Sequence, residues 1–236
     1  MEIPNTNSNI SKTLTINVIY NSLCLFMDNH IDQFPVFLKE AEIENKKNDL
    51  IKKEKFVQED DITLRLSRFF NHCDSSFYFE NQSKTPETNA TTDIGVLVKK
   101  PYSDRVICFI EAKRLPTPEG KNREKTEYAY YESTSKQGGI ERFKTEKHGG
   151  KEKFTFSFML AYIQENNAGY WFQEVNDWVD SQIELSSNPE IIWNEKDKLN
   201  QDLSFSKGAI TKYYSTHSRR TLDEIKLVHY WIELVN

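Results

Sequence analysis

The feature that most constrains the fold is a run of five apolar residues, Val106-Ile107-Cys108-Phe109-Ile110, which is rich in branched side chains. Such a run predicts a buried strand. A second apolar run, Ile94–Val98, precedes it across a segment that holds Pro101 and Asp104. Because proline and aspartate are typical of turns, the two runs are expected to pair as antiparallel neighbours.

Helical and strand patterns flank this hairpin. Residues 14–45 predict two helices, or one helix broken near Pro35, and 44–55 is expected to be an exposed connection. Apolar residues on one face predict a helix over Glu59–Cys73. The other expected elements are strands over 76–79, 154–163 and 226–235, and helices over 140–147 and 170–183, with polar loops between them. This order predicts one α/β domain, a mixed central sheet flanked by helices.

Composition excludes several classes of protein. Hydrophobic residues make up 37% of the 236 and aromatic residues 13%, which is enough for a packed core and excludes general disorder. No apolar run approaches the ~18 residues of a membrane span, and the polar N-terminus does not have the pattern of a signal peptide. Cys24, Cys73 and Cys108 lie far apart, so they are expected to be buried, reduced thiols of a cytoplasmic protein.

The charge distribution is uneven. The net charge is -5, which by itself argues against a nucleic-acid partner. Residues 99–153, however, carry 14 basic and 9 acidic side chains. A basic middle third indicates either a local phosphate-binding surface or a solvated helix face, and charge alone favours the solvated face.

Acidic and basic side chains occur where the two hairpin strands are expected to meet. Asp93 opens the first strand, and Glu111-Ala112-Lys113 ends the second. Residues two apart in a strand share a face, so Glu111 and Lys113 point the same way, and a tight hairpin brings Asp93 beside them. Carboxylates that hold Mg²⁺ activate water and absorb charge on a phosphate, and a lysine neutralises developing negative charge.

The Glu-x-Lys tripeptide alone is not a specific signal, but its position relative to the two predicted strands makes the copy at Glu111 specific. Glu-x-Lys also occurs at Glu44, Glu119 and Glu224. Only the copy at Glu111 directly follows an apolar strand and has a strand-opening acid eighteen positions upstream. We therefore take Asp93, Glu111 and Lys113 as the candidate catalytic residues.

These residues resemble a known family. Thr92-Asp93-Ile94-Gly95-Val96 followed by Phe109-Ile110-Glu111-Ala112-Lys113 is similar to the signature of the PD-(D/E)xK nucleases, the restriction-endonuclease-like fold. Thr92 stands where the family name has a proline, a loosely kept position. The resemblance covers roughly residues 56–165 and makes them a catalytic core, with 1–55 as an N-terminal helical extension and 166–236 completing a single nuclease domain.

The resemblance implies a metal-dependent nuclease that hydrolyses phosphodiester bonds in nucleic acid, expected to be DNA. It implies Mg²⁺, with Mn²⁺ as a substitute, held by Asp93, Glu111 and Ala112. Such nucleases often add a glutamate from the first core helix, and Glu59 is the best match because it lies on the apolar face, where an unpartnered charge is costly. The alternative for Glu59 is a simple cap of the helix start. Double-strand cutters of this fold often pair, so a homodimer is an expected arrangement.

Other polar residues are weaker candidates for nucleic-acid contacts. Gln137, Arg142 and Lys144 lie at or near the start of the short helix, where amides and basic side chains could bind a phosphate. Surface decoration is the alternative, more so for Lys144. In the run 215–220, His217 and Arg219 could contact a backbone, although an ordinary polar loop is favoured. Two other functions remain open: a catalytically inactive nucleic-acid-binding module of the same fold, and a protein-interaction subunit.

Overall fold

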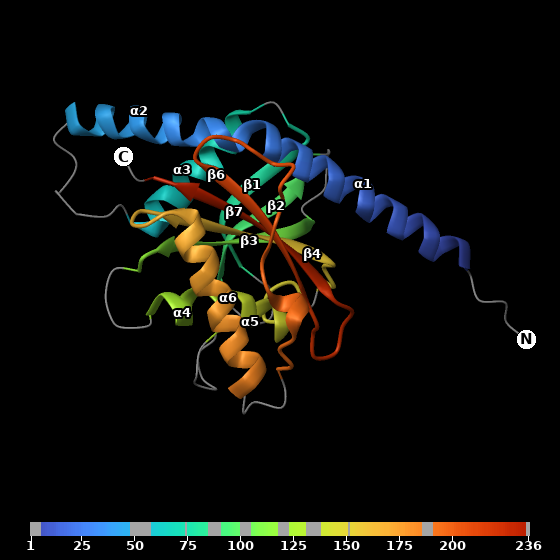
Figure 1. Cartoon of the computed structure of the whole chain (residues 1–236). Helices are drawn as coiled ribbons and strands as arrows, with labels where there is room; N and C mark the ends of the chain where they lie inside the picture. The colour runs from blue at the N-terminus through green and yellow to red at the C-terminus, as the bar shows by residue number, and fades with distance from the viewer. Residues whose placement is uncertain are drawn as a thin grey trace, which may run out of the picture.

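The computed structural model describes residues 6–47, 58–73, 75–84, 91–99, 105–117, 123–130, 138–150, 152–185 and 191–234. They form helices and strands (Figure 1). In chain order, the elements are α1 (Thr6–His30), η1 (Ile31–Gln33), α2 (Phe34–Lys47), α3 (Glu59–His72), β1 (Phe77–Lys84), β2 (Thr91–Val98), β3 (Val106–Leu115), α4 (Arg123–Tyr128), α5 (Gly139–Lys144), β4 (Phe156–Ile163), α6 (Ala168–Leu185), η2 (Glu195–Asp197), β5 (Asn200–Gln201), β6 (Ile210–His217) and β7 (Ile225–Glu233).

The strands form one seven-stranded mixed sheet in the order β1-β2-β3-β4-β7-β6-β5. β3 and β4 are parallel, as are β4 and β7, whereas every other neighbouring pair is antiparallel. Helices cover both faces of the sheet, with α1, α2 and α3 on one side and α4, α5 and α6 on the other (Figure 1). This confirms the predicted α/β class with a mixed central sheet flanked by helices.

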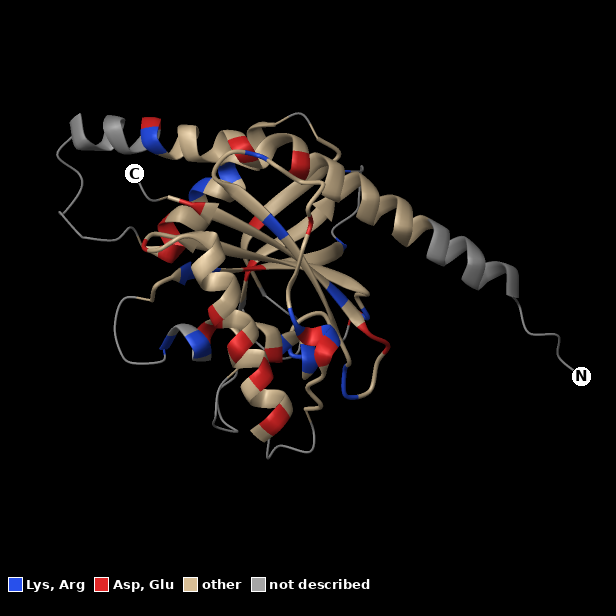
Figure 2. Cartoon of the chain, viewed as in Figure 1, with Lys and Arg blue, Asp and Glu red and all other residues tan. Residues whose placement is uncertain are grey.

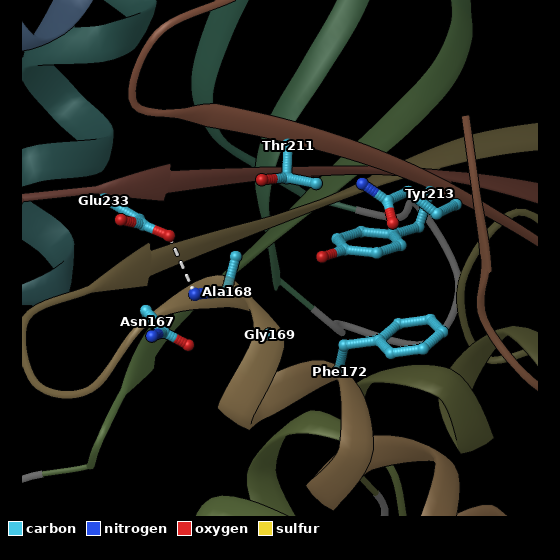
Figure 3. A pocket seen from close by; sticks show the side chains of 8 residues that line it. Asn167, Ala168, Gly169, Phe172, Thr211, Tyr213 and Glu233 are labelled. Atoms are coloured by element: carbon cyan, nitrogen blue, oxygen red, sulfur yellow. Dashed lines mark hydrogen bonds between the residues drawn. The ribbon is translucent and has the colours of Figure 1, made fainter. Parts of the chain in front are cut away.

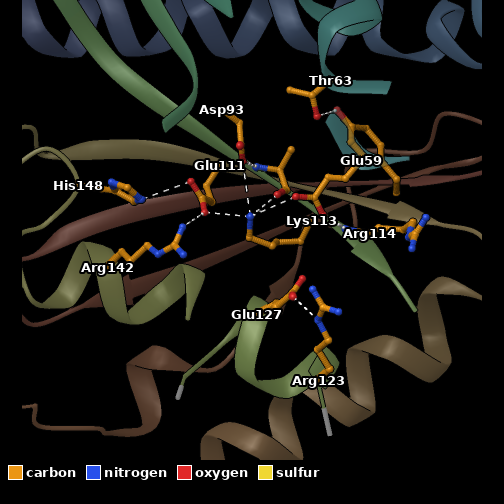
Figure 4. A network of polar contacts seen from close by, with 12 residues as sticks. Glu59, Thr63, Asp93, Glu111, Lys113, Arg114, Arg123, Glu127, Arg142 and His148 are labelled. Atoms are coloured by element: carbon orange, nitrogen blue, oxygen red, sulfur yellow. Dashed lines mark hydrogen bonds and ion pairs between the residues drawn. The ribbon is translucent and has the colours of Figure 1, made fainter. Parts of the chain in front are cut away.

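Each face of the sheet has its own apolar core. On the side of α1–α3, the aromatic residues Phe26, Phe70 and Phe79 pack against one another and belong to the same core as Ile110 and Ala112 of β3. On the other side, Trp171 and Val175 of α6 belong to a second core. Because side chains alternate along β3, Glu111 and Lys113 point to the side that holds α4 and α5 (Figure 4).

The central predictions are confirmed. β2 and β3 pair antiparallel, with Ile94 opposite Ile110, the residues that directly follow Asp93 and directly precede Glu111. The 3₁₀ turn η1 separates α1 from α2, and Pro35 is the second residue of α2, a position where proline is tolerated. α3 begins at Glu59, as predicted.

One boundary was predicted wrongly at the motif itself. β3 continues to Leu115, so Glu111-Ala112-Lys113 lies inside the strand instead of at its end. The strand continues because parallel pairing with β4 extends from Ile110 to Leu115. The polar side chains within this buried stretch have ionic partners, described below, which offset the cost of removing their charges from water.

Other elements escaped prediction. β6 and the short β5 lie in a segment that was expected to be a loop, and α4 was not expected. Both faces of β6 carry buried polar residues, Lys212 on one and Ser215 and His217 on the other, so neither face has an apolar alternation. The polar loop expected between the strands 76–79 and 94–98 is shorter than predicted, because β1 extends to Lys84 and β2 begins at Thr91; residues 85–90 lie outside the described chain.

The cysteines are free, as predicted, but only Cys108 is buried; Cys24 and Cys73 are half-buried. Within the described residues, no helix is long and apolar enough to cross a membrane.

Candidate active site

The ammonium group of Lys113 is the centre of a cluster of carboxylates from three elements (Figure 4). Lys113 Nζ lies 2.9 Å from Glu111 Oε1 within the same strand, 3.6 Å from Asp93 Oδ2 of β2 and 3.4 Å from Glu59 Oε1 of α3. It also donates a 2.6 Å hydrogen bond to the carbonyl oxygen of Ala112. The structure thus brings together all five residues that the motif and the resemblance pointed to.

Backbone amides of β3 hold two of these carboxylates in place. Asp93 Oδ2 accepts a 2.7 Å hydrogen bond from the amide of Ala112, and Glu59 Oε2 accepts one of the same length from the amide of Arg114. The Glu59 side chain therefore extends from the first turn of α3 to the backbone of β3. It does not act as a simple helix cap, because no side-chain cap is formed at the start of α3.

The carboxyl groups differ in their electrostatic environment. Burial raises the pKa of Asp93 to about 7, against the opposing effect of Lys113, and burial likewise raises the pKa of Glu59. Burial acts in the same direction on Glu111, but there Lys113, His148 and Arg142 outweigh it and hold its pKa well below the usual range. The three carboxylates in turn raise the pKa of Lys113 against the effect of its burial.

The donor set fits a hard divalent cation. The oxygens around Lys113 Nζ belong to three carboxylates and one backbone carbonyl, which are the ligands that Mg²⁺ and Mn²⁺ prefer. The side chains of Asp93 and Glu59 are each 23% exposed, so the cluster is open to solvent on their side. Across the described parts of the chain, however, no three His, Cys, Asp or Glu side chains are spaced to hold a metal as they stand. The ammonium of Lys113 takes the central position that a cation would need.

Two further groups contact Glu111 from α5 and the turn after it. Arg142 Nη1 lies 2.6 Å from Glu111 Oε1, and His148 Nε2 lies 3.3 Å from Glu111 Oε2. The imidazole of His148 packs edge-on against the rings of Phe109 and Phe143. Arg142 was predicted to bind a phosphate, but here it binds a carboxylate of the cluster. The sequence gives no signal for His148, because nothing in it relates this histidine to a residue 37 positions earlier.

The glycines around α5 make these contacts sterically possible. A Cβ on Gly138 would lie 2.5 Å from the backbone of Ala129 and Tyr130, so only glycine lets α5 start against the end of α4. Gly149 has a φ of +68°, a left-handed conformation that turns the chain directly after His148. Gly138 and Gly149 thus position Arg142 and His148, the two partners of Glu111 that come from α5 and the turn after it.

Comparison with known proteins adds nothing to these residues: the chain matches no protein-family model, no curated protein and no solved structure. The resemblance to the PD-(D/E)xK nucleases is therefore carried by the motif residues and their arrangement alone.

The structure contradicts part of the predicted phosphate site at the start of α5. The amide of Glu141 donates to the carbonyl of Ala129, and the amide of Gly138 donates to the Glu141 carboxylate, so both are already used. Gln137 lies outside the described residues. Lys144, expected at the surface, is buried and forms a 2.6 Å ion pair with Asp197.

His217 was also placed wrongly. It lies in β6 instead of a polar loop, and it is fully buried, so it cannot contact a nucleic-acid backbone. Its Nδ1 lies 2.5 Å from Asp197 Oδ1 and its Nε2 lies 2.6 Å from Ser215 Oγ. Asp197, His217 and Ser215 have the connectivity of a serine-hydrolase triad, but Ser215 is buried and already engaged by His229, so the arrangement is structural.

Arg219 is half-buried and donates to the carbonyl oxygens of Asp223 and Phe154. These bonds hold the segment between β6 and β7 against the start of β4. A contact between Arg219 and a nucleic acid stays a prediction.

Sequence reasoning missed Glu127. It lies on α4, four residues after its ion-pair partner Arg123, and points toward Lys113 from the side opposite α3 (Figure 4). Its charge contributes to the raised pKa of Glu59. No signal identified it, because α4 is short and highly charged and resembles a loop in sequence.

A separate pocket of about 400 Å³ lies where the start of α6 meets β6 and β7 (Figure 3). Phe172 and Tyr213 stack along one wall, and Glu233 accepts a hydrogen bond from the amide of Ala168. None of its eight lining residues is basic, so the pocket is unsuited to a phosphate.

Proposed function

We propose that this chain is a metal-dependent nuclease that hydrolyses phosphodiester bonds, with DNA as the expected substrate. The observation that carries the proposal is the convergence of Glu59, Asp93 and Glu111 on Lys113 in an otherwise apolar part of the sheet. Burying three carboxylates and a lysine costs stability that apolar residues would not cost, so such a cluster is typical of a functional site.

The parts needed for phosphodiester hydrolysis are present in the cluster. A bound Mg²⁺ or Mn²⁺ would activate water and neutralise charge on the phosphate. Asp93, Glu111, the carbonyl oxygen of Ala112 and Glu59 are the proposed ligands. Lys113, displaced from their centre, remains within reach to orient the water and to stabilise developing negative charge.

The order of elements around the motif supports the restriction-endonuclease-like core. A helix, α3, precedes the antiparallel strands β1, β2 and β3, and helix α5 then leads to β4, which lies parallel to β3. This is the arrangement that the resemblance implies for residues 56–165, and α3 contributes Glu59 to the site.

Charge restricts how a nucleic acid approaches. α6 carries Glu174, Asp177, Asp180 and Glu184 and no lysine or arginine, and Figure 2 shows these acidic residues along the helix. A phosphate backbone is repelled there. We therefore expect the substrate to approach Asp93 and Glu59 from the side that is open to solvent, and to avoid the outer face of α6.

The test is cleavage of plasmid, linear duplex and single-stranded DNA, with RNA in parallel, in EDTA and after addition of Mg²⁺, Mn²⁺ or Ca²⁺. Cleavage is expected with Mg²⁺ and Mn²⁺ only. Ca²⁺ is expected to bind with little turnover, because its looser coordination positions water less well. Robust cleavage in EDTA would overturn the proposal.

A non-cutting nucleic-acid-binding module is the second candidate, because Lys113, Arg142 and His148 already compensate the buried charge of Glu111. It predicts binding of the same DNA without cleavage under every metal condition.

A further inference from the structure

Glu111 is the most enclosed carboxylate of the candidate active site. Its side chain is 1% exposed, with Arg142 and Lys113 at Oε1 and His148 near Oε2. Glu111 Oε2 accepts no hydrogen bond from the described residues, but a cation at either oxygen is repelled by the positive groups at Oε1, so its binding favours the departure of one of them.

The three neighbours differ in how easily they can leave. The side chains of His148 and Lys113 are 2% and 9% exposed, so Lys113 can shift within the cluster, but neither group can become fully solvated without opening the core around it. The Arg142 side chain is 36% exposed. Its guanidinium belongs to the most exposed of the three side chains, so it can leave Glu111 for solvent at a lower cost than Lys113 or His148.

We propose that Arg142 is a metal-displaced arginine: it binds Glu111 when the cation is absent and turns to a phosphate of the nucleic acid when the cation is bound. This inference rests on the proposed function and deepens it. Arginine suits both states, since its planar guanidinium forms charge-assisted hydrogen bonds with carboxylates and phosphates alike.

The exchange makes metal and substrate binding cooperative. A phosphate that binds Arg142 draws it from Glu111 Oε1 and so removes one of the positive charges that oppose a cation at this carboxylate. By thermodynamic reciprocity, the cation then increases the affinity for the phosphate by the same factor. Without either ligand, Glu111 keeps its partner and the buried charge stays compensated.

The test is the affinity for Mn²⁺ alone, measured by calorimetry and by electron paramagnetic resonance, for wild type, Arg142→Met and Arg142→Gln. If Arg142 competes with the cation, both variants bind Mn²⁺ about tenfold more tightly, which corresponds to one lost charge-assisted hydrogen bond. A residue that merely supports the fold would give the opposite result, weaker binding. Circular dichroism establishes that each variant is folded.

A second measurement tests the phosphate half of the exchange. In Ca²⁺, the affinity of a short DNA duplex is expected to fall in both variants, with a salt slope smaller by about one unit. Lys147→Met is the matched control. Lys147 is exposed in the turn that joins α5 to His148, so the substitution removes the same charge from a side chain that does not contact Glu111. It should leave Mn²⁺ affinity within twofold of wild type.

The outcomes separate the two proposals. Mn²⁺ affinity that is unchanged or weaker in the Arg142 variants overturns the exchange and leaves the nuclease intact. An equal gain in Lys147→Met also overturns it, because general electrostatics would then suffice. Absence of carboxylate-dependent Mn²⁺ binding in wild type and variants alike overturns the proposed function itself.

Discussion

Asp197 Oδ1 lies 2.5 Å from Nδ1 of His217, and both side chains are fully buried. His217 holds the pKa of Asp197 below its usual range despite burial, so the aspartate is an acceptor and His217 carries its proton on Nδ1. Burial lowers the pKa of His217, so the ring is neutral and its Nε2 accepts from the hydroxyl of Ser215. Together these assignments determine the donor and the acceptor in each remaining hydrogen bond of the network.

The first prediction concerns tautomers. Because Ser215 donates to His217, it accepts from Nε2 of His229, and Nδ1 of His229 accepts from the hydroxyl of Tyr128. The indole of Trp231, which can only donate, donates to Tyr128. Long-range proton–nitrogen NMR correlations are expected to find the proton on Nδ1 of His217 and on Nε2 of His229. The opposite tautomer at either ring would contradict the network.

The second prediction is the pH dependence of stability. Burial lowers the pKa of His217 and of His229, so below about pH 6.5 the unfolded chain takes up protons that the native rings refuse. The free energy of unfolding should therefore decrease as pH falls, by up to ~1.4 kcal/mol per pH unit for each ring.

Urea unfolding between pH 5 and 8, a window around the ordinary histidine pKa, measures this slope. His229→Gln keeps a donor and an acceptor and should lose about half of it. His72→Gln, on the exposed side of α3, is the control. A slope that His229→Gln leaves intact would mean that other groups cause it.

The sequence predicted the site better than it predicted the sheet around it. Asp93, Glu111, Lys113 and Glu59 were identified because local rules apply to them: strand alternation, a hairpin and the phase of one helix. β6 was missed because His217 and Lys212 occupy inward positions, where apolar residues were expected. Their partners, Asp197 and Asp28, are 20 and 184 residues away, and no local pattern encodes such pairs.

The third prediction concerns Asp93 and Glu111, whose charges are expected to have opposite effects on the stability of the fold, a difference that the sequence does not reveal. The pKa of Asp93 is raised to about 7, so between about pH 4 and 7 the native chain keeps a proton that the unfolded chain releases. The ionised group therefore disfavours folding at higher pH, and Asp93→Asn should raise the melting temperature at pH 8 in EDTA. The pKa of Glu111 is lowered, so its charge favours folding, and Glu111→Gln should reduce the melting temperature.

Melting curves in EDTA and in Mg²⁺ test this pair. Mg²⁺ should stabilise wild type and should stabilise both variants less, because each has lost a proposed ligand. If the melting temperatures of the two variants in EDTA shift in the same direction, the ionised forms of Asp93 and Glu111 do not have opposite effects on folding, and the prediction is wrong.

The fourth prediction concerns the first core helix. Glu59→Gln keeps an oxygen for the amide of Arg114 but removes a charge from the cluster. It should weaken Mg²⁺ binding and slow cleavage with little change in stability. Asp60→Asn is the matched control, since Asp60 is the next residue of α3 and is exposed. Equal losses from both would mean that only the general negative charge of the helix start matters.

The last prediction concerns Lys113, on which the nuclease proposal depends. Lys113→Met removes the ammonium that three carboxylates share, so it should lower cleavage on the order of 10²-fold, since a donor aimed at developing charge is typically worth ~3 kcal/mol. It should also lower the melting temperature in EDTA, and Mg²⁺ should restore part of that loss, because a divalent cation can compensate the same carboxylates. Lys212→Met is the matched control: Lys212 is another buried lysine, paired with Asp28 at 2.8 Å on the opposite face of the sheet. It should melt at a lower temperature as well, yet cut at the wild-type rate per folded molecule. Rates and melting curves measured on the same preparations decide between the two roles, and a Lys113→Met protein that cuts as fast as wild type would end the assignment of catalysis to this site.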